Sequence, residues 1–299
     1  MKKQRFNSLT SAGPVFPAPY KYRGWSLKEE KLGLLAEEML WKLSHYIETD
    51  YWKEPTFQKN VWFCLKPELT QTQQNLNFPE DFMPLLTKMK EIKDQEKETK
   101  KNRTKEEKFA EKAEKDRLKS IYGIAIVDGE PTEIGGYLVE EANWILTRGK
   151  DPRKGMWKYR VDPTEVTLNI VNEKPPVDWT GKIESNPTGV WVFKYQQLCG
   201  RGNKACLLNK VVSISKNTEI GRDMTGEKYD KAANILTSWT KVEQFIDRAL
   251  KTNDPTIQES AVIAYLIAIT GIRIGGERDL KYQADTQGMS TLRVEHIKL

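Results

Sequence analysis

Apolar residues recur at helical spacing in several segments of this chain. Residues 26–46 carry one such stripe, formed by Leu32, Leu35, Met39 and Leu43. Ser26 with Glu29 three residues later is a capping-box pattern, which predicts that this helix begins at Ser26. We expect this stripe to lie in the hydrophobic core. Residues 229–250 begin another region that is predicted to be helical.

A highly charged segment follows further along. Residues 88–119 hold 13 basic and 9 acidic residues among 32 positions, without Pro or Gly. Such a segment is either helical or disordered. Thr104 and Glu107 form a second capping-box pattern, so we predict two helices that meet near residues 102–104. The charges alone also fit a purely solvated face.

Shorter apolar or alternating runs predict small strands between Pro- and Gly-rich turns. They occupy residues 121–127, 166–171 and 190–193. Residues 8–25 are rich in Pro, Gly and aromatic residues, which favours an extended arm. Helices that alternate with small strands place the chain in the α+β class.

The last forty residues contain the most distinctive helix end. Asp254 and Pro255 predict its start, residues 261–269 carry no charge, and Gly271 predicts its end. The expected result is a buried helix that delivers Arg273 into a loop.

The residues after Arg273 favour anion binding. Gly275 and Gly276 have no Cβ, so their backbone N–H groups can approach a phosphate closely, and Arg278 adds a second planar cation. This combination suits a phosphodiester. The alternative is a solvated arginine that is favoured by the helix dipole.

Composition narrows the class of protein. The 299 residues include 48 Lys and Arg against 42 Asp and Glu, a net charge of +6, so any basic surface must be local. Three scattered cysteines and two histidines predict neither a disulfide framework nor a structural zinc site, and they fit a reducing compartment. Without an apolar run of membrane length or a secretory signal, we expect a soluble intracellular protein.

Residues 144–161 form the local basic segment. Six of these 18 residues are cations, interrupted by Gly149, Pro152 and Gly155: Arg148, Lys150, Arg153, Lys154, Lys158 and Arg160. Basic loops bind polyanions by releasing counterions. Nucleic acid, another acidic ligand and plain solvation all remain open from the residues alone.

Six motifs occur together in an order that resembles eukaryotic-type DNA topoisomerase I, the type IB family. They are GPVF (13–16), TKEEK (104–108), RGKDPRKGMWK (148–158), EKYDKA (227–232), RIGGE (273–277) and TLRVEHI (291–297). The chain departs from the family at Gly276, where Asn is usual, at Asp151 and Arg153, where His and Lys are usual, and at Ala205, where an aromatic residue is usual.

The resemblance implies three parts. Residues 1–25 would be an N-terminal arm, 26–225 a DNA-binding cap with charged helices at about 86–120, and 226–299 the start of the catalytic core. Family members relax supercoiled DNA through a transient single-strand break and a 3′-phosphotyrosyl intermediate, without ATP, metal or another cofactor. Arg273 matches the first catalytic arginine. The nucleophilic tyrosine and the other catalytic cations lie beyond the region that matches Leu299, so we expect this chain alone to be inactive.

The resemblance also implies a set of DNA contacts. These residues are Lys100, Arg148, Lys154, Lys158, Trp191, Lys204, Lys228, Gly275, Arg278 and Thr286. The implied partner is double-stranded DNA, with no membrane. Two alternatives are a non-catalytic DNA clamp and one subunit of a split topoisomerase whose C-terminal catalytic part is a separate polypeptide. We expect the protein to be intracellular with DNA, in the nucleus of a eukaryote or in a viral factory.

Overall fold

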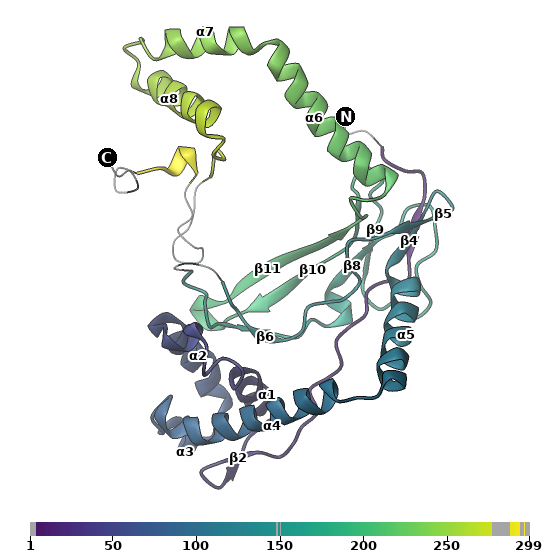
Figure 1. Ribbon diagram of the computed structural model, residues 1–299, viewed down its shortest axis with the longest axis vertical. Helices are drawn as coiled ribbons and strands as arrows, with labels where there is room; N and C mark the ends of the chain where they lie inside the picture. Colours follow the sequence, from purple (N-terminus) through teal and green to yellow (C-terminus); the bar gives the residue numbers. More distant parts are fainter. Residues whose placement is uncertain (1–3, 148, 150, 277–287, 294–295, 297–299) are drawn as a thin grey trace. The chain divides into compact units, whose positions relative to one another are not determined.

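The chain has the α+β fold that its sequence predicts, with helices and small sheets (Figure 1). The computed structural model describes residues 4–147, 149, 151–276, 288–293 and 296. Two compact units are present. Unit 1 spans residues 1–147 and 153–221, and unit 2 spans residues 148–152 and 222–299.

The helices of unit 1 lie mainly in its first half. The α-helices are α1 Leu34–Leu43, α2 Pro55–Leu65, α3 Gln71–Gln74, α4 Met83–Lys101 and α5 Lys105–Tyr122. Short 3-10 helices are η1 Asp50–Lys53, η2 Lys66–Glu68, η3 Glu80–Phe82, η4 Pro163–Glu165 and η5 Gly202–Lys204. One hydrophobic core joins α1, α2 and the start of α4 through Met39, Phe57 and Leu86, all fully buried. The predicted stripe of Leu32, Met39 and Leu43 belongs to this core.

Three sheets complete unit 1. The first joins β1 Leu9–Ser11, β4 Ile124–Val127 and β5 Glu130–Glu133, and the smallest pairs β2 Ser26–Leu27 with β3 Glu30–Lys31. The largest contains β6 Asn143–Trp144, β7 Trp157–Lys158, β8 Val166–Asn169, β9 Lys182–Glu184, β10 Trp191–Cys199 and β11 Cys206–Ser213. Strand β10 is its centre because it pairs with β7, β8 and β11, all antiparallel. A second core under this sheet includes Leu168 and Phe193.

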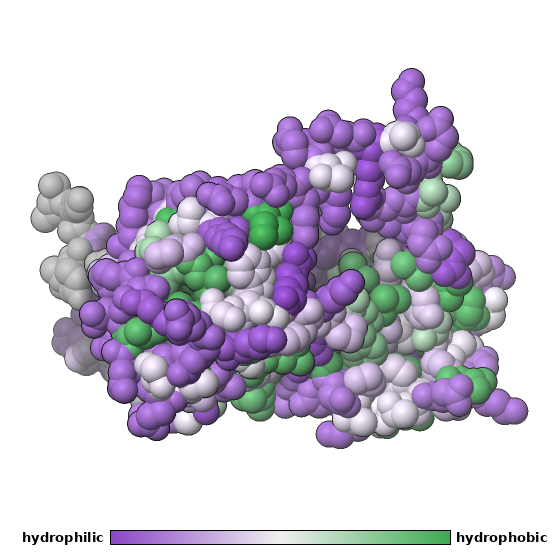
Figure 2. Space-filling view, turned by 90° about the horizontal axis from the view of Figure 1, so that it is seen from below, coloured by the Kyte–Doolittle hydropathy of each residue, from purple (hydrophilic) through white to green (hydrophobic). Residues whose placement is uncertain are grey.

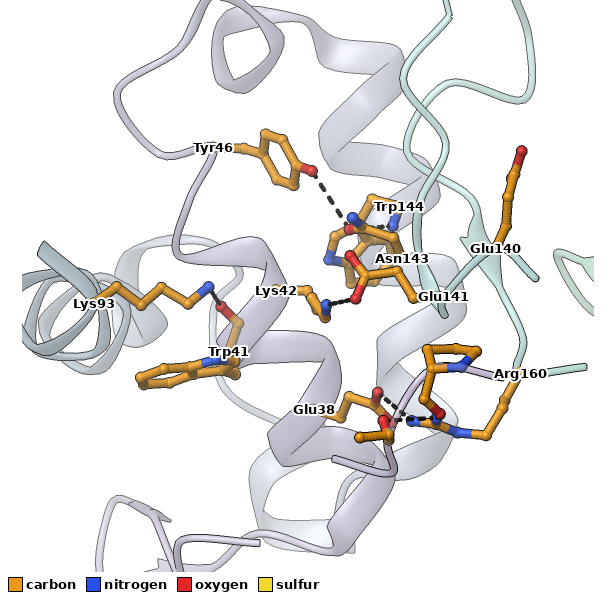
Figure 3. Close-up of polar contacts among 12 residues, drawn as sticks. Glu38, Trp41, Lys42, Tyr46, Lys93, Glu140, Glu141, Asn143, Trp144 and Arg160 are labelled. Carbon is orange, nitrogen blue, oxygen red and sulfur yellow. Dashed lines mark hydrogen bonds and ion pairs between the residues drawn. The ribbon is translucent and has the colours of Figure 1, made fainter. Parts of the chain in front are cut away.

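Polar contacts fasten α1 to the segment around β6 (Figure 3). Lys42 pairs with Glu141 at 2.5 Å, and the Tyr46 hydroxyl donates to Asn143 at 3.4 Å. Burial raises the pKa of the Glu38 carboxyl, although Arg160, 3.0 Å away, acts in the opposite direction. These contacts and the core fix the helices relative to the sheet within unit 1.

The division of the charged segment into two helices is confirmed. The Thr104 hydroxyl accepts from the backbone N–H of Glu107, and the Glu107 carboxylate accepts from the Thr104 N–H. This reciprocal cap starts α5 at Lys105, so that three residues separate it from the end of α4 at Lys101. The local signal was sufficient because both partners lie within one helical turn.

The predicted start of the first helix at Ser26 is wrong. Ser26 begins a tight β-hairpin whose turn residues, Lys28 and Glu29, have φ of 48° and 69°. Helix α1 starts only after Gly33. Positive φ at two non-glycine residues carries little sequence signal, which is why the capping pattern was misleading.

Unit 2 consists of helices in its described part: the greater part of α6 Glu219–Thr237, then α7 Trp239–Ala249, α8 Pro255–Thr270 and the 3-10 helix η6 Met289–Thr291. Both predicted ends of α8 are confirmed, since Asp254 caps its first turn and Gly271 follows with φ of 68°. The expectation that α8 is buried is not met: Ala261 is its single buried residue among those described. Among the described elements, α8 packs mainly against α7 and η6, and much of its apolar surface stays exposed, including Ile257, Tyr265 and Ile269.

A disulfide joins Cys199 and Cys206, although the sequence predicted no disulfide framework. The two residues lie directly opposite each other where β10 meets β11, with Cα atoms 5.3 Å apart. The register of the two strands decides this pairing, and the spacing of cysteines in the sequence does not reveal it. Cys64 is a buried free thiol.

The surface is mixed in character. In the face shown in Figure 2, hydrophobic patches lie among larger hydrophilic areas. Within the described part of the chain, no helix is long and apolar enough to cross a bilayer.

Candidate nucleic-acid interface

The basic loop between β6 and β7 is anchored on helix α2. The backbone N–H of Ile145 donates to Met156 O at 2.8 Å, and that of Gly155 donates to Ile145 O at 2.9 Å. Gly155 has φ of 81°, and a Cβ there would lie 2.3 Å from the Phe57 carbonyl oxygen. Only glycine fits, because α2 passes directly behind the loop. Two of the predicted cations of this loop, Arg148 and Lys150, lie outside the described residues.

Lys154 belongs to the base of this loop and is buried. Its ammonium lies 2.9 and 2.7 Å from the two carboxylate oxygens of Glu54, and its side chain is 5% exposed. It also lies 5.6 Å from the centre of the Tyr51 ring. In this arrangement Lys154 fastens the loop to the start of α2, and a phosphate contact requires the ion pair to open.

Lys158 shares an acidic partner with a second lysine. Its ammonium lies 2.9 Å from Glu140, and Lys210 of β11 pairs with the other oxygen of the same carboxylate. Burial alone raises the pKa of Glu140, but the hydrogen bonds and charges of Lys210 and Lys158 more than offset it, so the net pKa is lowered. Two cations around one carboxylate leave a net positive charge at this place on the sheet.

Two further predicted contacts lie at opposite ends of β10 and its loop. Trp191 is the first residue of β10, and the Lys194 ammonium lies 4.3 Å from the centre of its ring. Lys204 lies in η5, where its ammonium is 3.3 Å from Asn60 Oδ1 and 4.7 Å from the centre of the Phe63 ring. Each predicted residue is therefore part of a cation–aromatic pair.

Three basic residues beside Lys204 were not predicted as site residues. Lys59 lies on the same face of α2 as Trp62 and Phe63, Lys66 follows directly after α2 as the first residue of η2, and Arg201 precedes η5. The sequence contained a pattern that could have predicted part of this group, because positions 59, 62, 63 and 66 have the i, i+3, i+4, i+7 spacing of one helical face. Their proximity to Arg201 depends on the tertiary fold.

Two predicted contacts are exposed on helices. Lys100 lies in the last turn of α4, beside the same surface hollow as Arg103. Lys228 is exposed on α6, in unit 2. Arg278 and Thr286 lie outside the described residues.

The loop that carries Arg273 is held by its backbone. The carbonyl oxygen of Arg273 accepts from the Met289 N–H at 2.9 Å, and that of Ile274 accepts from the Ser290 N–H at 2.7 Å and the Ser290 hydroxyl at 2.8 Å. The Arg273 side chain itself is exposed. A fixed backbone with an exposed guanidinium suits a residue that must meet a large anionic ligand.

Gly275 is required by a close approach of two backbone segments. It has φ of 83°, and a Cβ there would lie 2.7 Å from Cα of Gly288. A Cβ on Gly288 would lie 2.2 Å from Cα of Gly275. The two glycines therefore let η6 come close enough to hold the Arg273 loop, a role for Gly288 that the sequence did not indicate.

The described residues contain no cluster of three or more His, Cys, Asp or Glu side chains that could hold a metal ion. What they do bring together is lysine and arginine with aromatic rings, in unit 1, and an exposed arginine on a fixed loop, in unit 2. Such surfaces are characteristic of proteins that bind nucleic-acid phosphates.

Comparisons with known proteins place the chain in a family. The family model described as eukaryotic DNA topoisomerase I, DNA binding fragment, matches residues 4–208. The model for the catalytic core of the same enzyme matches residues 217–299. The chain belongs to the eukaryotic DNA topoisomerase I family.

The sequence similarity to individual relatives extends over 99% of the chain. It is 28% identical over 312 residues to DNA topoisomerase 1 of Caenorhabditis elegans, covering 99% of this chain and 37% of the relative. It is 28% identical over 307 residues to DNA topoisomerase 1 beta of Arabidopsis thaliana, covering 99% and 32%, respectively. For the human DNA topoisomerase 1 the figures are 26% over 312 residues, 99% and 39%. The chain thus spans 32% to 39% of the length of these relatives.

Proposed function

We propose that this chain is the DNA-clamping portion of a type IB DNA topoisomerase. The matches to the family models over residues 4–208 and 217–299 carry the proposal. The arm at 1–25 and the cap at 26–225 would bind duplex DNA, and residues 226–299 would begin the catalytic core. The basic and aromatic groups around Lys158, Trp191 and Lys204 support the binding part of the proposal.

The proposed reaction relaxes supercoiled DNA by transient cleavage of one strand. A tyrosine oxygen attacks the phosphorus of a phosphodiester, the bond to the 5′ oxygen breaks, and a 5′-hydroxyl leaves. The same hydroxyl later attacks the 3′-phosphotyrosyl bond, which reseals the strand and frees the tyrosine. Arg273 would stabilise the charge that builds up on the phosphate oxygens, because a guanidinium is always charged and donates two parallel hydrogen bonds. Its backbone is already fixed by Met289 and Ser290, so little reorganisation is needed.

The remaining catalytic groups would come from a C-terminal portion, either on the same polypeptide or on a separate one. Residues 1–299 alone are expected to bind duplex DNA without relaxing it. The proposed location is with DNA, in the nucleus of a eukaryote or in a viral factory.

The proposed contacts outside the buried base of the loop are Lys100, Arg148, Lys158, Trp191, Lys204, Lys228, Gly275, Arg278 and Thr286. Lys154 instead positions the basic loop against the start of α2, because its ammonium already pairs with Glu54.

Arg273→Ala separates catalysis from binding. Duplex affinity should change by less than about 3-fold, whereas relaxation by the protein completed with its C-terminal portion should fall on the order of 100- to 1000-fold. Arg222→Ala is the matched control, because Arg222 is also exposed in unit 2 and lies outside the proposed site. If Arg273→Ala instead weakens binding and relaxation by the same factor, Arg273 is only a phosphate contact.

A further inference from the structure

A basic and aromatic pocket lies between α2 and the loop before β11. Its volume is about 540 Å³. One wall is the helical face with Lys59, Trp62, Phe63 and Lys66, and the other carries Arg201 and Lys204. This size falls in the usual range for small-ligand pockets.

The charge of the pocket is strongly one-sided. Four of its lining residues are cations, and none of its described lining residues is acidic. Arg201 pairs with Glu68, 2.9 Å away at the edge, whereas Lys59 and Lys66 make no ion pair with any described residue. Two lysines without acidic partners in a concave site favour an anionic occupant.

The aromatic rings give the pocket a second chemistry. Trp62 stacks on Phe78 with ring centres 5.3 Å apart and planes 9° from parallel, so one face is braced and the other is turned away from Phe78. The Lys66 ammonium lies 5.6 Å from the Trp62 ring centre, and that of Lys204 lies 4.7 Å from Phe63. A lysine that swings from the ring to a phosphate leaves an aromatic face to which a planar base can stack.

We propose that this pocket binds an unpaired nucleotide of DNA next to the clamped duplex. The base would stack on Phe63 and Trp62, and its flanking phosphates would contact Lys59, Lys66 and Arg201. An unpaired nucleotide fits better than a base pair, because only an unstacked base offers its face to a ring. The proposal rests on the proposed function, since it assumes that the protein holds DNA.

The test compares two fluorescent DNAs with the whole chain: a blunt duplex, and the same duplex with a short single-stranded tail that contains 2-aminopurine. The tailed DNA should bind about 10-fold more tightly, with quenching of the 2-aminopurine emission by stacking. Phe63→Leu and Lys66→Gln should each remove most of this preference, measured as the ratio of the two affinities, and Lys66→Gln should leave the affinity for blunt duplex within about 2-fold. Lys174→Gln is the control, because Lys174 is an exposed lysine in unit 1 outside the pocket.

Each other result overturns the proposal. Equal affinity for both DNAs without quenching means that no unpaired base enters the pocket. Equal weakening of both DNAs by Lys66→Gln makes the pocket a duplex phosphate contact, which leaves the proposed function intact. Failure of the wild-type chain to bind either DNA overturns both this inference and the proposed function. Circular dichroism of Phe63→Leu shows whether that variant is folded, and Lys66→Gln, at an exposed position, keeps the test valid if it is not.

Discussion

The ammonium of Lys204 lies 3.3 Å from the side-chain oxygen of Asn60. Asn60 is 3% exposed, and its amide nitrogen donates to the carbonyl oxygen of Lys154 at 2.8 Å. These partners are 144 and 94 residues away from Asn60 in the chain. One buried amide on α2 therefore holds both the basic loop and the loop before β11.

Asn60→Ala should destabilise the protein by about 1–3 kcal/mol, because the Lys154 carbonyl loses a buried donor. Lys204 also loses its acceptor, so duplex affinity should fall. Urea denaturation and DNA titration measure the two effects. Asn217→Ala, at an exposed asparagine in unit 1, should stay within about 0.5 kcal/mol of wild type. If Asn60→Ala is as stable as this control, the amide does not organise the site.

The ion pair of Glu54 with Lys154 predicts that removing the carboxylate destabilises the protein more than removing the ammonium. Glu54→Gln leaves the buried ammonium without its counterion and should cost about 2–4 kcal/mol. Lys154→Met removes the buried charge itself and should cost less. Because Lys154 has a positioning role, Lys154→Met should also leave the salt dependence of DNA binding unchanged. A slope that falls by about one unit would instead identify a phosphate contact.

The shared carboxylate of Glu140 predicts a gain of DNA binding. Glu140→Gln removes the negative charge beside Lys158 and Lys210, so duplex affinity should rise and its salt dependence should become steeper. Glu173→Gln is the matched control, since Glu173 is an exposed carboxylate of unit 1 outside the proposed DNA contacts. An unchanged affinity in Glu140→Gln would place both lysines outside the interface.

The same carboxylate predicts an acid-sensitive contribution to stability. The folded state lowers the pKa of Glu140 below its ordinary value of 4.5. The stabilisation is therefore complete above pH 4.5 and is lost as the pH falls through the lowered pKa. The difference in unfolding free energy between wild type and Glu140→Gln, measured from pH 7 to pH 3, should shrink below pH 4.5. A constant difference would show that the pair contributes no pH dependence.

The sequence predicted features whose partners are close in the chain. Thr104 and Glu107 form one local cap, and Asp254 with Gly271 defines α8 at both ends. It failed at Ser26, where two non-glycine residues with positive φ make a turn. Local patterns carry capping energies but not the tertiary contacts that stabilise such a turn.

The candidate site depends more on long-range structure. The basic loop was visible as a run of cations, yet the burial of Lys154 follows from its contact with Glu54, 100 residues earlier. The pocket combines α2 with residues near Arg201, and the disulfide depends on the register of β10 and β11. Neither follows from spacing in the sequence.

The lowered pKa of Lys93 predicts that the unfolding free energy increases at alkaline pH. Burial, and then the charges of Lys42, Lys97 and Arg23, lower its pKa from 10.5 to about 8, while its ammonium donates to the Trp41 carbonyl and lies 4.8 Å from the Trp41 ring (Figure 3). Below pH 8 the folded state holds an unfavourable charge, and this penalty disappears between pH 8 and pH 10.5. Such a shift corresponds to about 3 kcal/mol, which partial exposure reduces to about 1–2 kcal/mol.

Lys93→Met tests this directly. At pH 7 the variant should be about 1 kcal/mol more stable than wild type, and this advantage should vanish near pH 10. Urea denaturation at both pH values gives the difference, from which groups common to the two proteins cancel. Lys97→Met, at an exposed lysine of the same helix, should show no such change. A pH-independent difference for Lys93→Met would mean that its ammonium is as well solvated as an ordinary lysine.

The disulfide between Cys199 and Cys206 closes the loop that carries Arg201 and Lys204. A cross-link over so short a loop should stabilise the protein by about 2–3 kcal/mol, mainly by restricting the unfolded chain. Cys206→Ser and treatment of wild type with reductant should therefore lower the unfolding free energy by similar amounts, and reductant should have little effect on the variant. Thiol titration after denaturation should detect Cys64 alone in the oxidised protein and all three cysteines after reduction. If three thiols react without reductant, the two cysteines are unpaired in the purified protein, and the loop before β11 is held by Asn60 and its backbone contacts instead.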